Sequence, residues 1–180
     1  MSEPQTGSIP IFYSCIPNAT EGPPIEIAWA MLASEAQGVI CESRLIRPPA
    51  AWTPELARNP PALQAYELTV SDLRDYGAPI RVIAAHMNAT LANRELFSAK
   101  VDDDARIRRI FEAAKIAPEF ALRKTDAVEL IAEMARMRLM PPVALARAKR
   151  EAEVMCLTGV RAEAQARFLA TYWAFVAGRN

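Results

Sequence analysis

The sequence predicts an α/β fold in which helices flank a mixed β-sheet. Three segments near the N-terminus, 9–16, 25–30 and 38–46, have strand patterns and short connections, which indicates an antiparallel meander. Helical patterns then alternate with short strand patterns, and the C-terminal part is helical. This order is typical of a mixed sheet, with the meander antiparallel and the later strands parallel.

The three strands of the meander have different residue patterns. The first, 9–16, is a continuous apolar run, so we expect it to be buried on both faces. The second, 25–30, and the third, 38–46, alternate with a period of two residues, so we expect each to pack one face. Turn residues at 18–24 and at 35–38 connect the three strands.

The segment that follows the meander, 47–65, contains closely spaced prolines that exclude a long helix or a central strand. We expect a structured loop with a short helical turn near 54–58, held to the body by Trp52. A short helix is predicted over 69–76 with Ser71 as its N-cap.

The remaining elements follow from capping residues and apolar periodicity. A helix begins at Pro79, a position that proline favours, and another follows the three acids Asp102–Asp104. Asp126 and Glu129 have the spacing of a capping box. The other predicted elements are short strands at 95–100 and 118–123 and helices at 126–140, 143–155 and 161–177.

Length and composition indicate one ordinary globular domain over residues 1–180, with 1–8 as a disordered tail. Lys and Arg total 21, as do Asp and Glu, so no overall charge attracts polyanions. The three cysteines are too scattered for a disulfide framework or a zinc site. The sequence has neither a signal-peptide pattern nor a run of membrane length, so we expect a cytoplasmic protein without membrane contact.

Four segments together resemble one enzyme family. They are PIEIAWAML at 24–32, TVSDLRDYGAPIRVIAAHMN at 69–88, LFSAKVDDDARIRRIF at 96–111 and RAEAQARFLATYW at 161–173. In content and order they resemble the DEDD-type (DEDDh) 3′–5′ exonucleases, the family of ribonuclease T and of the proofreading subunit of DNA polymerase III. The resemblance covers nearly the whole chain and implies a ribonuclease H-like fold.

The resemblance also assigns positions to the family's catalytic residues. Those positions are Ser14, Ile16, Asp103, Val160 and Gln165, with Asp104 as the alternative to Asp103. The family has an Asp-x-Glu pair at the first two, an acid at the third, a histidine at the fourth and an acid at the last. Only the third position retains a carboxylate, so the resemblance implies a degenerate catalytic site.

Such exonucleases use two hard metal ions that require oxygen ligands, chiefly carboxylates. One carboxylate with a serine and an amide is a poor substitute, so we expect no metal cofactor, with Asp103 as a weak candidate ligand. The sequence thus predicts a non-catalytic homologue that binds single-stranded nucleic acid, a protein partner or a second copy of itself. The alternative is a divergent active exonuclease on single-stranded DNA or RNA, using Mg²⁺ or Mn²⁺ on Asp102–Asp104 and Glu26.

Other residues have two interpretations each. Asp102–Asp104 are either remnants of a metal site or a helix N-terminal cap. His86, the single histidine, is in a mid-helix position that favours a packed or surface role over a catalytic one. A third hypothesis, a self-associating structural protein, depends on the methionines at 134, 137 and 140. Six basic residues form either a phosphate track or a solvated surface: Arg106, Arg108, Arg109, Arg147, Lys149 and Arg150.

Overall fold

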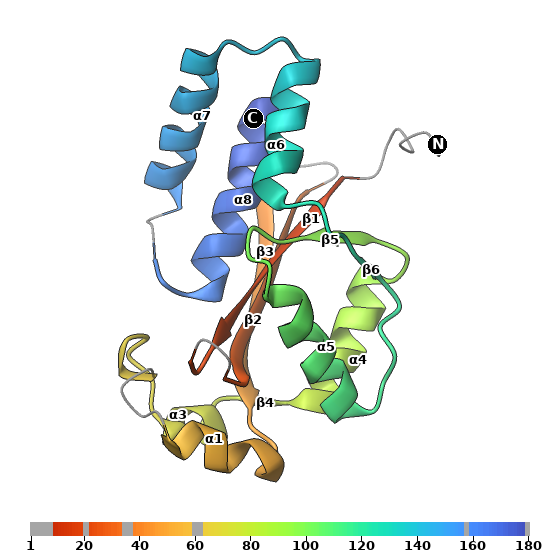
Figure 1. Cartoon of the computed structure of the whole chain (residues 1–180), viewed down its shortest axis with the longest axis vertical. Helices are drawn as coiled ribbons and strands as arrows, with labels where there is room; N and C mark the ends of the chain where they lie inside the picture. The colour runs from red at the N-terminus through yellow and green to blue at the C-terminus, as the bar shows by residue number, and fades with distance from the viewer. Residues whose placement is uncertain (1–8, 20–21, 34–37, 59–62, 157–158, 179–180) are drawn as a thin grey trace.

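A six-stranded mixed sheet organises the chain. The computed structural model describes residues 9–19, 22–33, 38–58, 63–156 and 159–178. The strands are β1 (Ile11–Pro17), β2 (Pro24–Leu32), β3 (Val39–Arg47), β4 (Ala78–Pro79), β5 (Glu95–Phe97) and β6 (Ala121–Leu122). Their order across the sheet is β4-β3-β2-β1-β5-β6 (Figure 1). The predicted tail at 1–8 and most of the turn at 35–38 lie outside the described residues.

The predicted antiparallel meander with parallel additions is confirmed. β1 pairs with β2 and β2 with β3 in antiparallel register, whereas β5 joins β1, β6 joins β5 and β4 joins β3 in parallel. The helices are η1 (Ala50–Trp52), α1 (Thr53–Arg58), α3 (Val70–Asp75), α4 (Ile80–Leu91), α5 (Asp103–Ala114), α6 (Ala127–Met137), α7 (Pro142–Met155) and α8 (Ala162–Ala177).

Helices cover both faces of the sheet (Figure 1). On one face α8 packs on the three meander strands, with α6 and α7 against it. On the other face α4 and α5 enclose a second apolar cluster that includes Tyr13, Cys15 and Trp29. Because consecutive strand residues point to opposite faces, β1 contributes Phe12 and Ile16 to the first cluster and Ile11, Tyr13 and Cys15 to the second.

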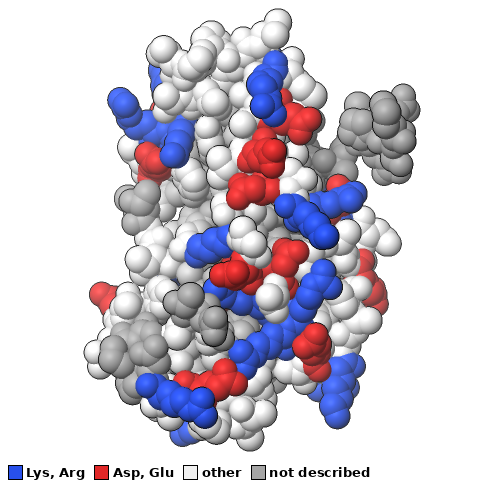
Figure 2. Space-filling model, viewed as in Figure 1, with Lys and Arg blue, Asp and Glu red and all other residues white. Residues whose placement is uncertain are grey.

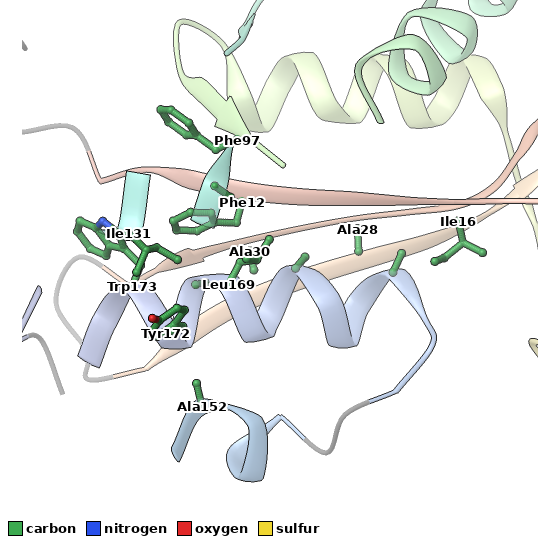
Figure 3. Close-up of a cluster of buried hydrophobic side chains, with 14 of the residues drawn as sticks. Phe12, Ile16, Ala28, Ala30, Phe97, Ile131, Ala152, Leu169, Tyr172 and Trp173 are labelled. Atoms are coloured by element: carbon green, nitrogen blue, oxygen red, sulfur yellow. The ribbon is translucent and has the colours of Figure 1, made fainter. Parts of the chain in front are cut away.

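Burial of β2 differs from the prediction, which gave this strand a single packed face. All but one of its residues are buried, including Ala28 and Ala30. These two small residues face α8, which presents alanines of its own such as Ala166, so helix and sheet approach closely (Figure 3). The alternation in the sequence therefore reflects large and small buried residues, not buried and exposed ones.

The N-cap of helix α3 lies two residues earlier than predicted. Its N-cap is Thr69, not Ser71: the Thr69 side chain accepts a hydrogen bond from the Asp72 amide, and the Asp72 carboxylate accepts from the Thr69 amide. The predicted capping box at Asp126 is correct only for its first residue. Asp126 is the N-cap of α6, but its side chain accepts from the Val128 amide and not from the Glu129 amide that a capping box uses. Among the described helices, none is both long and apolar enough to cross a bilayer.

Candidate functional site

The candidate site lies beside the part of β1 that follows its pairing with β5. β5 pairs with Ile11 and Phe12 of β1, and no strand of the described residues lies beside the following backbone of β1 on that side. The N-terminus of α5 fills this place on one face of the sheet, and the N-terminus of α8 covers the other face. Two helix N-termini and one open stretch of strand therefore meet around Ser14 and Cys15.

Asp103 occupies the open side of β1. Its side chain is 0% exposed and its carboxylate accepts three hydrogen bonds. The donors are the backbone amide of Cys15 at 3.2 Å, the Ser98 hydroxyl at 2.7 Å and the Arg106 guanidinium at 2.9 Å. The carboxylate thus takes the place of a strand neighbour for Cys15 and fixes the first turn of α5 to the sheet.

The groups next to Asp103 are also held by burial and charge. The Tyr13 hydroxyl donates to Asp104 at 2.5 Å. Burial, and then the Asp104 carboxylate, raise the pKa of Tyr13, so this phenol stays protonated as a donor. Burial lowers the pKa of Lys100, and the nearby Asp103 partly opposes that change.

Ser14 and Gln165, two positions matched to the exonuclease carboxylates, lie in contact. The Ser14 hydroxyl donates to Oε1 of Gln165 at 2.8 Å, although 151 residues separate them in sequence. Gln165 in turn donates through Nε2 to the backbone carbonyl of Val160 at 3.1 Å. Val160 is 57% exposed, so its backbone carbonyl contacts Gln165 while the residue itself is largely open to solvent.

The fifth position, Ile16, is buried beside a charged pair. Its partner across the β1–β2 ladder is Glu26, a buried carboxylate. Arg161 donates to both oxygens of Glu26, through Nε at 2.8 Å and Nη2 at 3.2 Å, and the Ala162 amide donates at 3.2 Å. Glu26 therefore caps the N-terminus of α8 and joins it to β2.

This set of side chains does not fit a pair of hard metal ions. Ile16 has no donor atom, and the hydroxyl of Ser14 and the amide of Gln165 bind each other. Asp103 and Glu26 each accept three hydrogen bonds, including one or two from an arginine. Within the described ranges, no three acidic, histidine or cysteine side chains are grouped as metal ligands.

The other candidates are distributed over the surface. His86 contacts Glu42 at 2.7 Å and lies against the Trp29 ring. The six basic residues do not form one track, because α5 and α7 belong to opposite faces of the sheet (Figure 1). On the face shown in Figure 2, basic side chains alternate with acidic ones.

Sequence reasoning missed three partners that define the site. The Arg106 contact with Asp103 has the i, i+3 spacing of a helical pair and was detectable on that signal. The Ser98 contact depends on where β5 ends, and Arg161 lies 135 residues from Glu26. Neither of these two contacts leaves a local pattern in the sequence.

Solved structures with a similar fold are nucleases. E. coli Exonuclease I in complex with a dT13 oligonucleotide matches with a TM-score of 0.51 and 19% identity, covering 76% of this chain and 31% of that one. Exonuclease X in complex with 5′ overhanging duplex DNA matches with a TM-score of 0.54 and 14% identity, covering 94% and 91%. An ExoI/SSB-Ct complex matches with a TM-score of 0.54 and 16% identity, covering 96% and 42%.

These matches show the fold. The chain has the ribonuclease H-like exonuclease fold and is similar in structure to DEDDh exonucleases at low identity. It spans about a third of the length of the Exonuclease I chains that head the matches. No protein-family model matches the sequence, and the search among curated proteins finds no match.

Proposed function

We propose that this protein is a non-catalytic homologue of the 3′–5′ exonucleases that binds single-stranded nucleic acid without cutting it. The observation that carries the proposal is the Ser14–Gln165 hydrogen bond. It joins two neutral side chains at positions where the resemblance expects metal-binding carboxylates. A hydroxyl and an amide that bind each other offer little to a divalent cation.

Loss of the metal ligands removes the main source of catalysis in such a site. Stabilisation of the charge that develops on the phosphate is usually the largest contribution, and two metal ions supply it in these enzymes. The position matched to the general base is Val160, which cannot accept a proton from water. Each loss alone is expected to reduce the rate by orders of magnitude.

Binding can persist when cleavage is lost, because affinity for nucleic acid depends mainly on phosphate contacts and base stacking. Exonuclease I and Exonuclease X structures with this fold hold DNA in the solved complexes. The equal numbers of acidic and basic residues predict weak binding that falls steeply with salt. We place the contact on the side of the sheet where α5 begins, close to the candidate site.

The cleavage test uses a labelled single-stranded oligonucleotide with Mg²⁺ and with Mn²⁺. We expect no shortening from the 3′ end above background. The matched variant is Asp103→Asn with Asp104→Asn, checked for folding by circular dichroism. Metal-dependent cleavage that this double variant abolishes would overturn the non-catalytic proposal and favour the divergent active enzyme.

The binding test measures fluorescence anisotropy of the same oligonucleotide at low and at physiological salt. We expect binding at low salt that Arg108→Ala weakens about three- to tenfold, because Arg108 is exposed on α5. Lys149→Ala on α7 is the control, since it removes one exposed charge on the opposite face. Equal effects of the two variants would contradict the location, and absence of binding at low salt would leave a protein partner as the better hypothesis.

A further inference from the structure

The outer edge of β3 is long and largely open. On its inner side β3 pairs with β2 from Val39 to Leu45. On its outer side only Ile46 and Arg47 have a partner, the two-residue strand β4. In the part of the chain that the structure describes, no strand lies beside 39–45 on that side. An open edge of this length presents unpaired backbone amides and carbonyls.

The two ends of the sheet differ in how they are protected. At the other end, β6 is only two residues long, and a short edge strand limits pairing with another chain. β3 has nine residues, lacks proline and glycine, and pairs with β2 without a bulge in the paired residues. Among the described residues, Glu42 and Arg44 place charges on one face of this edge, and Glu163 of α8, which accepts a hydrogen bond from the Ser43 hydroxyl at 3.2 Å, lies beside the other face.

The charges of Glu42 and Arg44 favour one register for self-pairing over the two registers next to it. In a two-fold antiparallel pair, residues equally far from the centre lie opposite each other on the same face. A centre at Ser43 places Glu42 opposite Arg44 twice and Cys41 opposite Leu45 twice. A centre at Glu42 or at Arg44 instead places like charges opposite each other, which is unfavourable.

We propose that β3 pairs with the same strand of a second copy of this chain, antiparallel and centred on Ser43. The pairing extends over 41–45, because β4 occupies the edge at Ile46 and Arg47. Within one chain, both Arg44 and His86 contact Oε2 of Glu42, at 3.1 and 2.7 Å. Arg44 of the second copy approaches the same carboxylate from across the new ladder, and two sheets become one. The inference is independent of the proposed function.

The first test measures self-association by sedimentation velocity over a wide range of protein concentrations. We expect a monomer–dimer equilibrium that Arg44→Glu weakens at least about tenfold, because two opposite-charge contacts become two like-charge contacts. The double variant Glu42→Arg with Arg44→Glu restores the dimer by exchanging the charges. Arg147→Glu on α7 makes the same change in net charge at an exposed position and leaves the equilibrium unchanged.

The second test uses geometry instead of charge. In the proposed register Ser43 faces Ser43 of the second copy at about 4.5–5.5 Å between Cα atoms, within the range of a disulfide. Ser43→Cys is therefore expected to give a disulfide-linked dimer with diamide as oxidant. Cys41 of the unaltered protein gives none, because the two Cys41 residues lie roughly 14 Å apart along the ladder.

Three results would overturn the proposal. The first is an unaltered protein that stays monomeric at all concentrations. The second is a dimer that responds equally to Arg44→Glu and Arg147→Glu, which would place the interface elsewhere. The third is a Ser43→Cys variant that shows no cross-link while its thermal unfolding matches that of the unaltered protein.

Discussion

The two buried carboxylates of the described residues, Asp103 and Glu26, have similar surroundings on opposite faces of the sheet. Each lies at the N-terminus of a helix, and each accepts a backbone amide and an arginine. The arginines differ. The Arg106 side chain is 11% exposed, whereas that of Arg161 is 39% exposed. Removal of Asp103 therefore affects a desolvated cation, and removal of Glu26 affects one that water already reaches.

The partners also differ in sequence separation. Asp103 binds Ser98 and Arg106, which are five and three residues away, together with one amide of β1. Glu26 binds only groups that lie about 135 residues along the chain. Asp103 therefore organises a local loop against the sheet, while Glu26 holds the C-terminal helix to the meander. Both acids have clear structural roles, although the family resemblance assigns a catalytic position to Asp103.

The largest effect is expected for Asp103→Ala. The change removes the nearer of two carboxylates that Arg106 contacts and leaves the Cys15 amide without its acceptor, which lowers the free energy of unfolding by about 3–5 kcal/mol. Urea denaturation measures it. Asp102→Ala is the control, because that side chain is 68% exposed and is expected to contribute less than about 0.5 kcal/mol. Equal losses would contradict the role given to burial.

A smaller effect is expected for Glu26→Gln. The amide oxygen still accepts from Ala162, but the charge that attracts Arg161 is lost, so the free energy of unfolding falls by about 1–3 kcal/mol. Denaturation of Glu151→Gln provides the control, since its contact with Arg147 is exposed to solvent and is expected to contribute little. If Glu26→Gln destabilised more than Asp103→Ala, the comparison of the two faces would be wrong.

The Ser14–Gln165 contact is expected to have a coupling energy of about 0.5–1.5 kcal/mol, because both groups are neutral. A double-mutant cycle with Ser14→Ala and Gln165→Ala measures it by denaturation. Strictly additive losses would show that the two side chains do not stabilise each other.

The last effect is confined to alkaline pH and concerns Cys41. Burial, only partly opposed by Arg167, raises the pKa of Cys41 from 9.0 to about 11. The folded state therefore binds the proton more tightly than the unfolded state, so this stabilisation is complete below pH 9 and is lost as the pH rises to 11. We expect a shallower decline in unfolding free energy over that range for Cys41→Ala than for the unaltered protein. Parallel pH profiles would contradict it.

The sequence predicted elements whose patterns are local. The meander follows from two-residue alternation and turn residues, and α8 (Ala162–Ala177) from helical periodicity. β5 is shorter than the predicted strand at 95–100, because Ser98 leaves the strand to reach Asp103. β4 was not predicted, since a two-residue strand forms only where the end of β3 is beside it.

The candidate site was predictable only in part. Residue spacing alone does not indicate that Ser14 and Gln165 meet, and only the resemblance of four segments to one family assigns both residues to one catalytic site. The Glu26–Arg161 pair was not predicted, because its partners are far apart in sequence and each is common on protein surfaces. Burial decides what these residues do, and burial depends on the complete fold.

The substitution of a side-chain carboxylate for a strand neighbour has a consequence for local dynamics. An amide paired within a ladder exchanges its hydrogen when the strands separate, whereas the Cys15 amide is released when the first turn of α5 moves. Hydrogen exchange at this single amide therefore reports the opening of the loop that carries Asp103. Exchange at Cys15 that is faster than at its buried neighbours in β1 would identify this corner as a unit that opens before the rest of the sheet.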